Sequence, residues 1–408
     1  MIPITSPPLM IKNYALKFTE FFSRPQFSHF VTYLTGLIVS VNKTVQGMND
    51  NFIGRKDQSS LNNFITDSDW DENAVDDRRI ELINEHTKDI KAKDSYLIID
   101  DTLSHKTGKK MEQVDLFYDH TIHKSILGHQ LVTSLLVSGN KHFPIKFRIY
   151  KKFRHGDPTF KTKIELAQEL IREAVQKAIN FSCVIFDSWY LSQAIVKLLS
   201  QFNKYWICPL KTNRIVLEHN KRIPLKEYVS KIPKHLFTKK NIKGSYYYYY
   251  AQTVKISKLG KIKLVLYHET EDFSDPLTII GSNAHVWTPD KIIYCYKQRW
   301  SIETFYKDSK QNLGLEDYEL RKIKGIMRHW YLVFSAYTLL QLSSSEKSLT
   351  KWINSNLKTI GDQCRFAVNE TIKYFALWVM KMYHSIHDEE KVVTLIFNTK
   401  AKLRFSLE

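Results

Sequence analysis

Three acidic positions in this chain have surroundings that point to chemistry on phosphate esters. Asp101 and Asp187 each follow a short apolar run typical of a buried strand, and Glu303 lies among cationic side chains in the segment YCYKQRWSIETFYKDSK. Carboxylates brought to one point repel each other unless a cation lies between them. Hard oxygen ligands favour Mg²⁺ or Mn²⁺, and a pair of such ions serves in-line phosphoryl transfer. The pattern predicts a metal-dependent site.

The segment around Glu303 has a regular spacing of polar residues, Tyr296-x2-Arg299-x3-Glu303-x6-Lys310. At about 100° per residue, these four positions fall within a stripe of about 60° on one face of a single predicted helix. A core-facing stripe would be apolar. This one carries a phenol, two cations and a carboxylate, which suits contact with a phosphate backbone.

Each of these residues also has a simpler interpretation. Asp187 can cap a helix that starts near residue 190. Asp100 and Asp101 can close a strand into a turn. Glu303 can belong to a solvated helix face and pair with Lys307 at i,i+4 spacing. The order of the elements favours one metal-dependent site formed by the three acids over these three separate interpretations.

The predicted elements have the order β-β-β-α-β-α-β. The two apolar runs that end in Asp101 and Asp187 form neighbouring strands of a mixed sheet, in which functional groups gather at the carboxyl ends. We therefore expect Asp101 and Asp187 to meet in a ribonuclease H-like α/β core. The predicted strands are 95–101, 129–138, 143–150, 182–187 and 205–209, and the helices between them are 161–180 and 190–203.

With these residues in place, the chain resembles a DDE transposase of bacterial insertion sequences, of the insertion-sequence-four type. Tyr296, Arg299, Glu303 and Lys310 fit the Y-x2-R-x3-E-x6-K signature of that type without a gap. Its first aspartate precedes a threonine, which selects Asp101 over Asp100, and its second ends the fourth strand, at Asp187. The resemblance covers roughly residues 90–345 and is weaker in the first ninety.

The resemblance implies a cut-and-paste transposase that cleaves the ends of its element and joins them to target DNA. It implies that Asp101, Asp187 and Glu303 bind two Mg²⁺ ions, with Mn²⁺ as a possible substitute. Tyr296, Arg299 and Lys310 are then DNA contacts. It also implies double-stranded DNA as partner, a homodimer in the end complex, and a hairpin intermediate by analogy. A basic stretch after the fifth strand adds two further DNA contacts, Lys211 and Arg214.

The chain divides into five predicted segments. A helical N-terminal DNA-binding region, 1–90, contains an amphipathic helix at 26–48 and a helical region within 72–90. The first part of the core, 91–209, is followed by a β-rich insertion, 210–290, with a hairpin around Leu259-Gly260. The remaining segments are 291–345, with the glutamate-bearing helix, and 346–408, a helical region for which structural packing and dimerisation are alternative roles.

Composition agrees with a polyanionic partner. Sixty Lys and Arg against 42 Asp and Glu give a formal charge of +18. No apolar run approaches the roughly 18 residues of a membrane helix and no signal peptide is evident, so we expect a cytoplasmic, nucleoid-associated protein. The resemblance also implies that Trp287, at the end of the insertion, is a candidate for a ring that holds a flipped base during hairpin formation, with a core position as the alternative.

Two other functions remain open from the sequence. One is a catalytically inactive or domesticated DNA-binding descendant of a transposase. The other is a ribonuclease H-like nuclease that cuts without strand transfer. All three carboxylates are present, which disfavours the first, and the signature with its long insertion disfavours the second.

Overall fold

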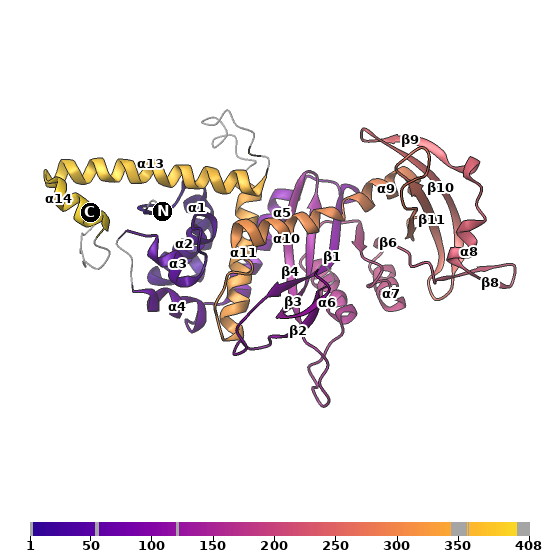
Figure 1. The fold of residues 1–408 in the computed structure, drawn as a ribbon, viewed down its shortest axis with the longest axis horizontal. Coiled ribbons are helices and arrows are strands. Elements are labelled where there is room, and N and C mark those ends of the chain that lie inside the picture. Colours follow the sequence, from indigo (N-terminus) through magenta and orange to yellow (C-terminus); the bar gives the residue numbers. More distant parts are fainter. Residues whose placement is uncertain (1–2, 54–56, 120–121, 344–356, 358, 398–408) are drawn as a thin grey trace. The chain divides into compact units, whose positions relative to one another are not determined.

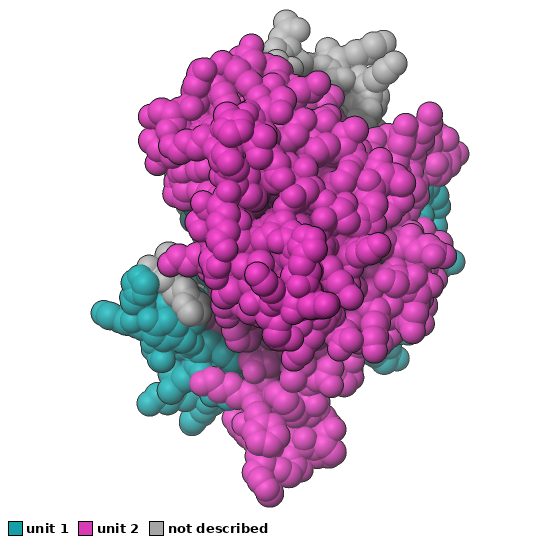
Figure 2. Space-filling model, turned by 90° about the vertical axis from the view of Figure 1, so that its right-hand side faces the viewer, with its two compact units in different colours: residues 1–86, 104–129, 306–408 teal, residues 87–103, 130–305 magenta. Residues whose placement is uncertain are grey.

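The structure is a computed structural model that describes residues 3–53, 57–119, 122–343, 357 and 359–397. The chain forms two compact units, each assembled from separate stretches (Figure 2). Unit 1 comprises residues 1–86, 104–129 and 306–408, and unit 2 comprises residues 87–103 and 130–305. The boundaries of these two units differ from those of the five segments predicted from the sequence. The roles assigned to those segments remain predictions. Part of the predicted 346–408 region lies outside the described residues.

The centre of unit 2 is a set of parallel strands. β1 (Ser95–His105) pairs in parallel with β5 (Cys183–Phe186), and β5 pairs in parallel with β6 (Tyr205–Pro209). Every side chain of β5 is buried, as expected for a strand covered on both faces. The predicted adjacency of the first and fourth core strands is confirmed.

A hairpin adjoins β1 in the sheet. β3 (Lys124–Ser138) and β4 (Lys141–Tyr150) pair antiparallel, which confirms the predicted meander. The turn between them places Gly139 at φ +60°, a conformation that glycine adopts without a steric cost. No local sequence pattern indicated β2 (Asp115–Asp119), a short edge strand that pairs with the beginning of β3.

The insertion extends the same sheet. β12 pairs antiparallel with β6, so the twelve-stranded mixed sheet continues in the order β6-β12-β11-β10-β7-β8, with β9 on β10 (Figure 1). The predicted hairpin is confirmed by the pairing of Ile256 with Gly260. The elements of the insertion are β7 (Ile215–Glu218), β8 (Lys221–Pro224), α8 (Leu225–Ser230), η3 (Lys234–Leu236), β9 (Thr238–Ile242), β10 (Ser245–Ile256), β11 (Gly260–His268) and β12 (Thr278–Ser282).

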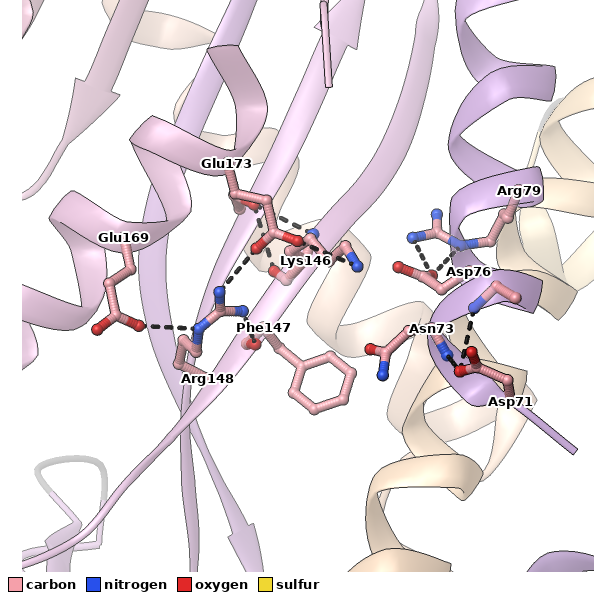
Figure 3. A network of polar contacts seen from close by, with 11 residues as sticks. Asp71, Asn73, Asp76, Arg79, Lys146, Phe147, Arg148, Glu169 and Glu173 are labelled. Carbon is pink, nitrogen blue, oxygen red and sulfur yellow. Dashed lines mark hydrogen bonds and ion pairs between the residues drawn. The ribbon is translucent and has the colours of Figure 1, made fainter. Parts of the chain in front are cut away.

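Two helices accompany the core strands of unit 2. α6 (Lys163–Gln176) begins with a capping box between Thr162 and Glu165, and α7 (Gln193–Gln201) begins at Ser192, whose hydroxyl accepts the N–H of Ile195. Arg148 of β4 donates to Glu169 and Glu173 of α6 at 3.1 and 2.7 Å and so fixes the helix on the strand (Figure 3). The short η2 (Ala92–Asp94) leads into β1.

The single helix predicted for the Tyr296–Lys310 stripe is wrong. The structure has α9 (Pro289–Lys297) and α10 (Trp300–Leu313), with turn residues Gln298 and Arg299 between them. Tyr296 therefore belongs to a different helix from Glu303, and the angular spacing expected for one continuous helix does not apply to it. Glu303 and Lys310, seven residues apart, do share α10.

Helices build most of unit 1. They are α1 (Leu9–Ala15), η1 (Leu16–Phe21), α2 (Arg24–Val39), α3 (Val45–Asp50), α4 (Gln58–Thr66), α5 (Glu72–Thr87), α11 (Ile323–Ser343), α13 (Ile360–Ile386) and α14 (Glu389–Phe397). α5 confirms the helical region expected within 72–90. α11 packs against α1, α2 and α4 of the N-terminal stretch. In the described parts of the chain, no helix is long and apolar enough to cross a membrane.

The predicted helix over 26–48 is also wrong, because the chain turns back after Val39. Lys43 donates to the carbonyls of Leu37 and Ser40, which end α2, and Thr44 caps α3 by accepting the N–H of Gly47. The apolar periodicity continues through both helices, so periodicity alone did not reveal the break.

A buried ion pair within α5 gives a test of the packing of unit 1. Asp76 Oδ1 lies 2.7 Å from Arg79 Nη2 (Figure 3), and both side chains are fully buried. Arg79 also donates to Thr338. Replacing Asp76 by alanine leaves a buried cation without its carboxylate. We expect Asp76→Ala to lower the free energy of unfolding by about 3–5 kcal/mol, measured by urea denaturation.

The control is the exposed pair between Lys322 and Asp67, which lies in the same unit. Lys322→Ala should leave the unfolding midpoint nearly unchanged, because water replaces an exposed ion pair at little cost. If Asp76→Ala unfolds at the same urea concentration as Lys322→Ala, the buried Asp76–Arg79 pair contributes no more to the free energy of unfolding than the exposed pair does.

Candidate active site

The pairing of β1 with β5 brings two aspartates together in unit 2. Asp100 and Asp101 lie inside β1, which continues to His105 and so does not end at residue 101 as predicted, whereas Asp187 directly follows β5. Ile99 is in register with Phe186, so the next residues along the two parallel strands are Asp100 and Asp187. Side chains in register on parallel strands project to the same face, and successive residues alternate between faces. Asp100 thus shares a face with Asp187, whereas Asp101 projects to the opposite one.

Arg299 links Asp100 of β1 to Glu303 of α10. Its Nη1 lies 3.4 Å from Asp100 Oδ2, and its Nη2 lies 2.7 Å from Glu303 Oε1. All three side chains are between a fifth and about a third exposed. Burial lowers the pKa of Arg299, but the charges of Asp100 and Glu303 outweigh it and raise the pKa overall. Arg299 therefore serves as the cation between two carboxylates.

The ionisation of Asp100 is strongly perturbed. Burial raises the pKa of Asp100 to about 7, the neighbouring charge of Asp101 adds to this, and the charge of Asp187 acts in the same direction. Arg299 opposes the rise but does not cancel it. A carboxyl group that shares its surroundings with other acids and titrates near neutrality is characteristic of functional sites.

Asp101 has a different set of partners. Its Oδ1 accepts the Tyr190 hydroxyl at 2.7 Å, and its Oδ2 accepts the Gln130 amide at 2.7 Å and the Lys163 ammonium at 2.8 Å. These donors come from the turn after β5, from β3 and from the first residue of α6. The sequence analysis did not identify any of the three, because no local pattern marks residues that converge from separate elements.

The other predicted site residues lie as follows. Tyr296 is partly buried, and burial raises its pKa while the adjacent Arg299 lowers it. Lys310 Nζ lies 2.6 Å from Glu316 Oε1 within unit 1. Lys211 and Arg214 lie close to the turn after β5, where Arg214 donates to the Leu191 carbonyl at 2.7 Å.

Trp287 occupies a core position, which was the alternative to a base-binding role. Its ring packs edge-on against Tyr205 with centroids 5.0 Å apart, and the ammonium of Lys291 lies 4.3 Å from its centroid. A ring held on two sides in this way has little surface left for a DNA base.

Within the described residues, no group of three or more histidine, cysteine or acidic side chains is close enough together to hold a metal ion in the conformation seen. Asp100 and Glu303 are instead joined through the guanidinium of Arg299, and Asp187 contributes charge to the same surroundings. The carboxylates of Asp100 on β1, Asp187 after β5 and Glu303 on α10 thus supply the oxygen donors. The guanidinium of Arg299 lies between Asp100 and Glu303.

A mixed α/β fold with acidic residues on two adjacent parallel strands and on a later helix is an arrangement suited to nucleases and transposases. Residues 17–232 match the family described as DDE superfamily endonuclease. This match covers more than half of the 408 residues, and the chain belongs to that family. It includes Asp100, Asp101 and Asp187 and ends before Arg299 and Glu303.

One relative is the probable transposase for insertion sequence element IS701 of Microchaete diplosiphon. It is 26% identical over 275 residues, which cover 66% of this chain and 70% of that protein. The NurA nuclease of Sulfolobus solfataricus aligns over 69% of this chain and 94% of its own, at 9% identity and a TM-score of 0.27. At that TM-score the similarity is no basis for an inference about fold or function.

The raised pKa of Asp100 predicts a cost in stability at neutral pH. The folded state holds this proton up to about pH 7, whereas an unfolded Asp loses it near pH 4, so ionisation of Asp100 weakens folding as pH rises between these values. We expect Asp100→Asn to raise the thermal midpoint at pH 7.5, by a gain of up to about 4 kcal/mol that shrinks towards pH 4.

The matched control is Asp272 on an exposed loop of the same unit, where its bond to Ser274 lowers its pKa. Asp272→Asn should show no such gain. A wild-type-like melting curve for Asp100→Asn across this pH range would mean that Asp100 is not held in a charge-disfavouring environment.

Proposed function

We propose that this chain is a cut-and-paste DNA transposase of the insertion-sequence-four type, which cleaves the ends of its element and joins them to target DNA. The observation that carries the proposal is the Arg299 bridge between Asp100 and Glu303, next to Asp187. Residues about 200 positions apart in the chain are joined at the strand ends where the sequence pattern predicts the reaction centre. The family match and the IS701-element relative support the same class of reaction.

The carboxylates fit a pair of Mg²⁺ ions, or Mn²⁺ in their place, because their donors are hard oxygens in partly buried positions. When bound, such ions supply an activated water or 3′-hydroxyl and stabilise the departing oxygen. Asp187 and Glu303 are the second and third acids of the proposed set. Glu303 is paired with Arg299 in the structure, so a metal ion would compete with this ion pair for the carboxylate.

The first acid of the set is one of two neighbours. The sequence resemblance names Asp101, and that assignment remains a prediction. The contacts favour Asp100, which faces Asp187 and Arg299, whereas Asp101 already accepts hydrogen bonds from Lys163, Gln130 and Tyr190. We propose that Asp100 takes the catalytic position and that Asp101 positions the segments around it.

The cationic residues near the site are proposed to hold DNA. Arg299 is placed to contact a phosphate once released from Glu303, and Tyr296 and Lys310 flank it along the chain. Lys211 and Arg214 follow the fifth core strand and supply phosphate contacts near Asp187. A formal charge of +18 suits double-stranded DNA as the partner.

Several finer features of the proposal come from the resemblance. The strand order around β1, β5 and β6 supports a ribonuclease H-like core. The first ninety residues are proposed to bind the ends of the element, a homodimer to hold two ends, and a hairpin to form during cleavage. The protein is proposed to act at the nucleoid.

The central test is cleavage and joining in vitro, with Mg²⁺, the DNA that flanks this gene and a supercoiled target. We expect cut ends and joined products with wild type, and a loss of at least about a hundredfold for both Glu303→Gln and Asp187→Asn with DNA binding retained. Chelation of the metal should abolish cleavage in wild type. Binding without cutting or joining would favour the inactive descendant, and cutting without joining would favour a nuclease.

The choice between the paired aspartates is tested by Asp100→Asn and Asp101→Asn in the same assay. We expect Asp100→Asn to abolish cleavage while keeping or raising the thermal midpoint. Asp101→Asn should lower the thermal midpoint, since it loses the ion pair with Lys163, and should retain measurable cleavage. Inactive Asp101→Asn beside active Asp100→Asn would restore the assignment made from the sequence.

A further inference from the structure

Arg299 is the cation that Asp100 and Glu303 share in the proposed active site. Its Nη1 lies 3.4 Å from Asp100 Oδ2, and its Nη2 lies 2.7 Å from Glu303 Oε1. The guanidinium uses a separate nitrogen for each carboxylate, so it lies between the two side chains that an ion bound by both would have to join. The guanidinium and such an ion repel each other at short range, and both cannot be held well at once.

The main chain of Arg299 is fixed, whereas its side chain reaches solvent. The Arg299 N–H donates to the Tyr296 carbonyl at 2.9 Å, and the Arg299 carbonyl accepts the N–H of Ile302 at 3.2 Å. The side chain of Arg299 is 24% exposed, compared with 34% for Glu303 and 20% for Asp100. A ligand from solution can thus reach the guanidinium, and rotation about the side-chain bonds is enough for Arg299 to exchange one partner for another.

A DNA phosphate is a suitable partner in such an exchange. A guanidinium pairs with a phosphate as it does with a carboxylate, through parallel N–H bonds. If a phosphate takes Arg299, Glu303 loses its cation, and a partly buried carboxylate without a cation is unfavourable. A divalent cation held by Glu303 removes this cost.

The converse also holds for Arg299. When Asp100 and Glu303 hold a divalent cation, Arg299 is displaced from both, and its partly buried guanidinium lacks an anion. A phosphate on Arg299 removes that cost. Each ligand thus favours the arrangement of side chains that the other requires. By thermodynamic reciprocity, the gain in affinity is the same in both directions.

We propose that Arg299 couples the binding of DNA to the binding of the metal ion. Without DNA it holds Asp100 and Glu303 and keeps the affinity for Mg²⁺ low, and a phosphate of bound DNA takes the guanidinium and frees both carboxylates. This inference rests on the proposed function and adds to it a control on when the carboxylates are available. The coupling is independent of base sequence, because the ligand of Arg299 is a phosphate.

The first test measures the binding of Mn²⁺ alone to the full chain without DNA, from the electron paramagnetic resonance signal of the unbound ion. We expect Arg299→Ala to bind Mn²⁺ about tenfold more tightly than wild type, because one charge-assisted hydrogen bond no longer competes. Arg299→Gln removes the charge but keeps a hydrogen-bond donor, and it should show a similar gain. Glu303→Gln should lose most of the binding.

Lys297→Ala is the matched control. Lys297 lies two residues before Arg299 and pairs with Glu269, and both side chains of this pair are more than a third exposed. The variant removes the same charge and so reports the general electrostatic effect, which should change the affinity for Mn²⁺ less than about twofold. Equal affinities for Mn²⁺ in Arg299→Ala and Lys297→Ala would overturn the proposal.

The second test measures the coupling from the side of the DNA. The probe is a short labelled duplex that carries an end of the element, with either a chelator or Ca²⁺, which takes the same oxygen ligands, at one ionic strength. Ca²⁺ should strengthen binding of the duplex about tenfold in wild type and less than about threefold in Arg299→Ala. An equal gain in both proteins would mean that the ion joins protein to DNA without any role for Arg299.

The outcomes separate the coupling from the function on which it rests. If wild type cuts and joins DNA but Arg299→Ala binds Mn²⁺ no more tightly than wild type does, the coupling is wrong and the transposase proposal stands. If wild type neither binds Mn²⁺ in the presence of the duplex nor cuts DNA, the proposed function fails, and the coupling fails with it.

Discussion

The parallel pairing of β1 with β5 imposes the constraint on which the site depends. Asp100 lies within β1 and Asp187 directly follows β5, so the register between the two strands places like charges side by side, and burial further disfavours the charged form of Asp100. Cationic side chains compensate the negative charge of these aspartates on both faces of the sheet. Arg299 approaches Asp100 from the segment between α9 and α10, and Lys163 approaches Asp101 from the start of α6.

Because successive side chains of a strand point to opposite faces, Asp100 and Asp101 have different surroundings. Asp100 remains poorly compensated, with a pKa near 7, and is the group whose charge a bound cation would stabilise. Asp101 is fully engaged by three donors and ties together β3, α6 and the turn after β5. A carboxyl group with a raised pKa and a carboxylate with three hydrogen-bond donors therefore lie next to each other on one strand.

The break between α9 and α10 matters to the same site. In place of a continuous helix, the chain has turn residues Gln298 and Arg299 between α9 and α10, and Arg299 still lies next to Tyr296. From this turn Arg299 reaches both Glu303, one helical turn further on, and Asp100 on β1. The insertion before α9 is likewise part of the architecture, because β12 pairs directly with β6 and extends the core sheet.

The sequence by itself determined the apolar runs of β1 and β5, their order and the acidic residues that follow these runs, because burial and strand propensity are local properties that leave a local pattern. It also pointed to Arg299 and Glu303 through their spacing. It did not show that β1 continues past Asp101 to His105. Only the tertiary structure decided that Asp100, and not Asp101, faces Asp187, since that depends on the register between strands more than 80 residues apart. It alone revealed Gln130, Lys163 and Tyr190 as partners of Asp101, and the breaks that ended two predicted helices, because hydrogen bonds between distant segments leave no periodic trace in the chain.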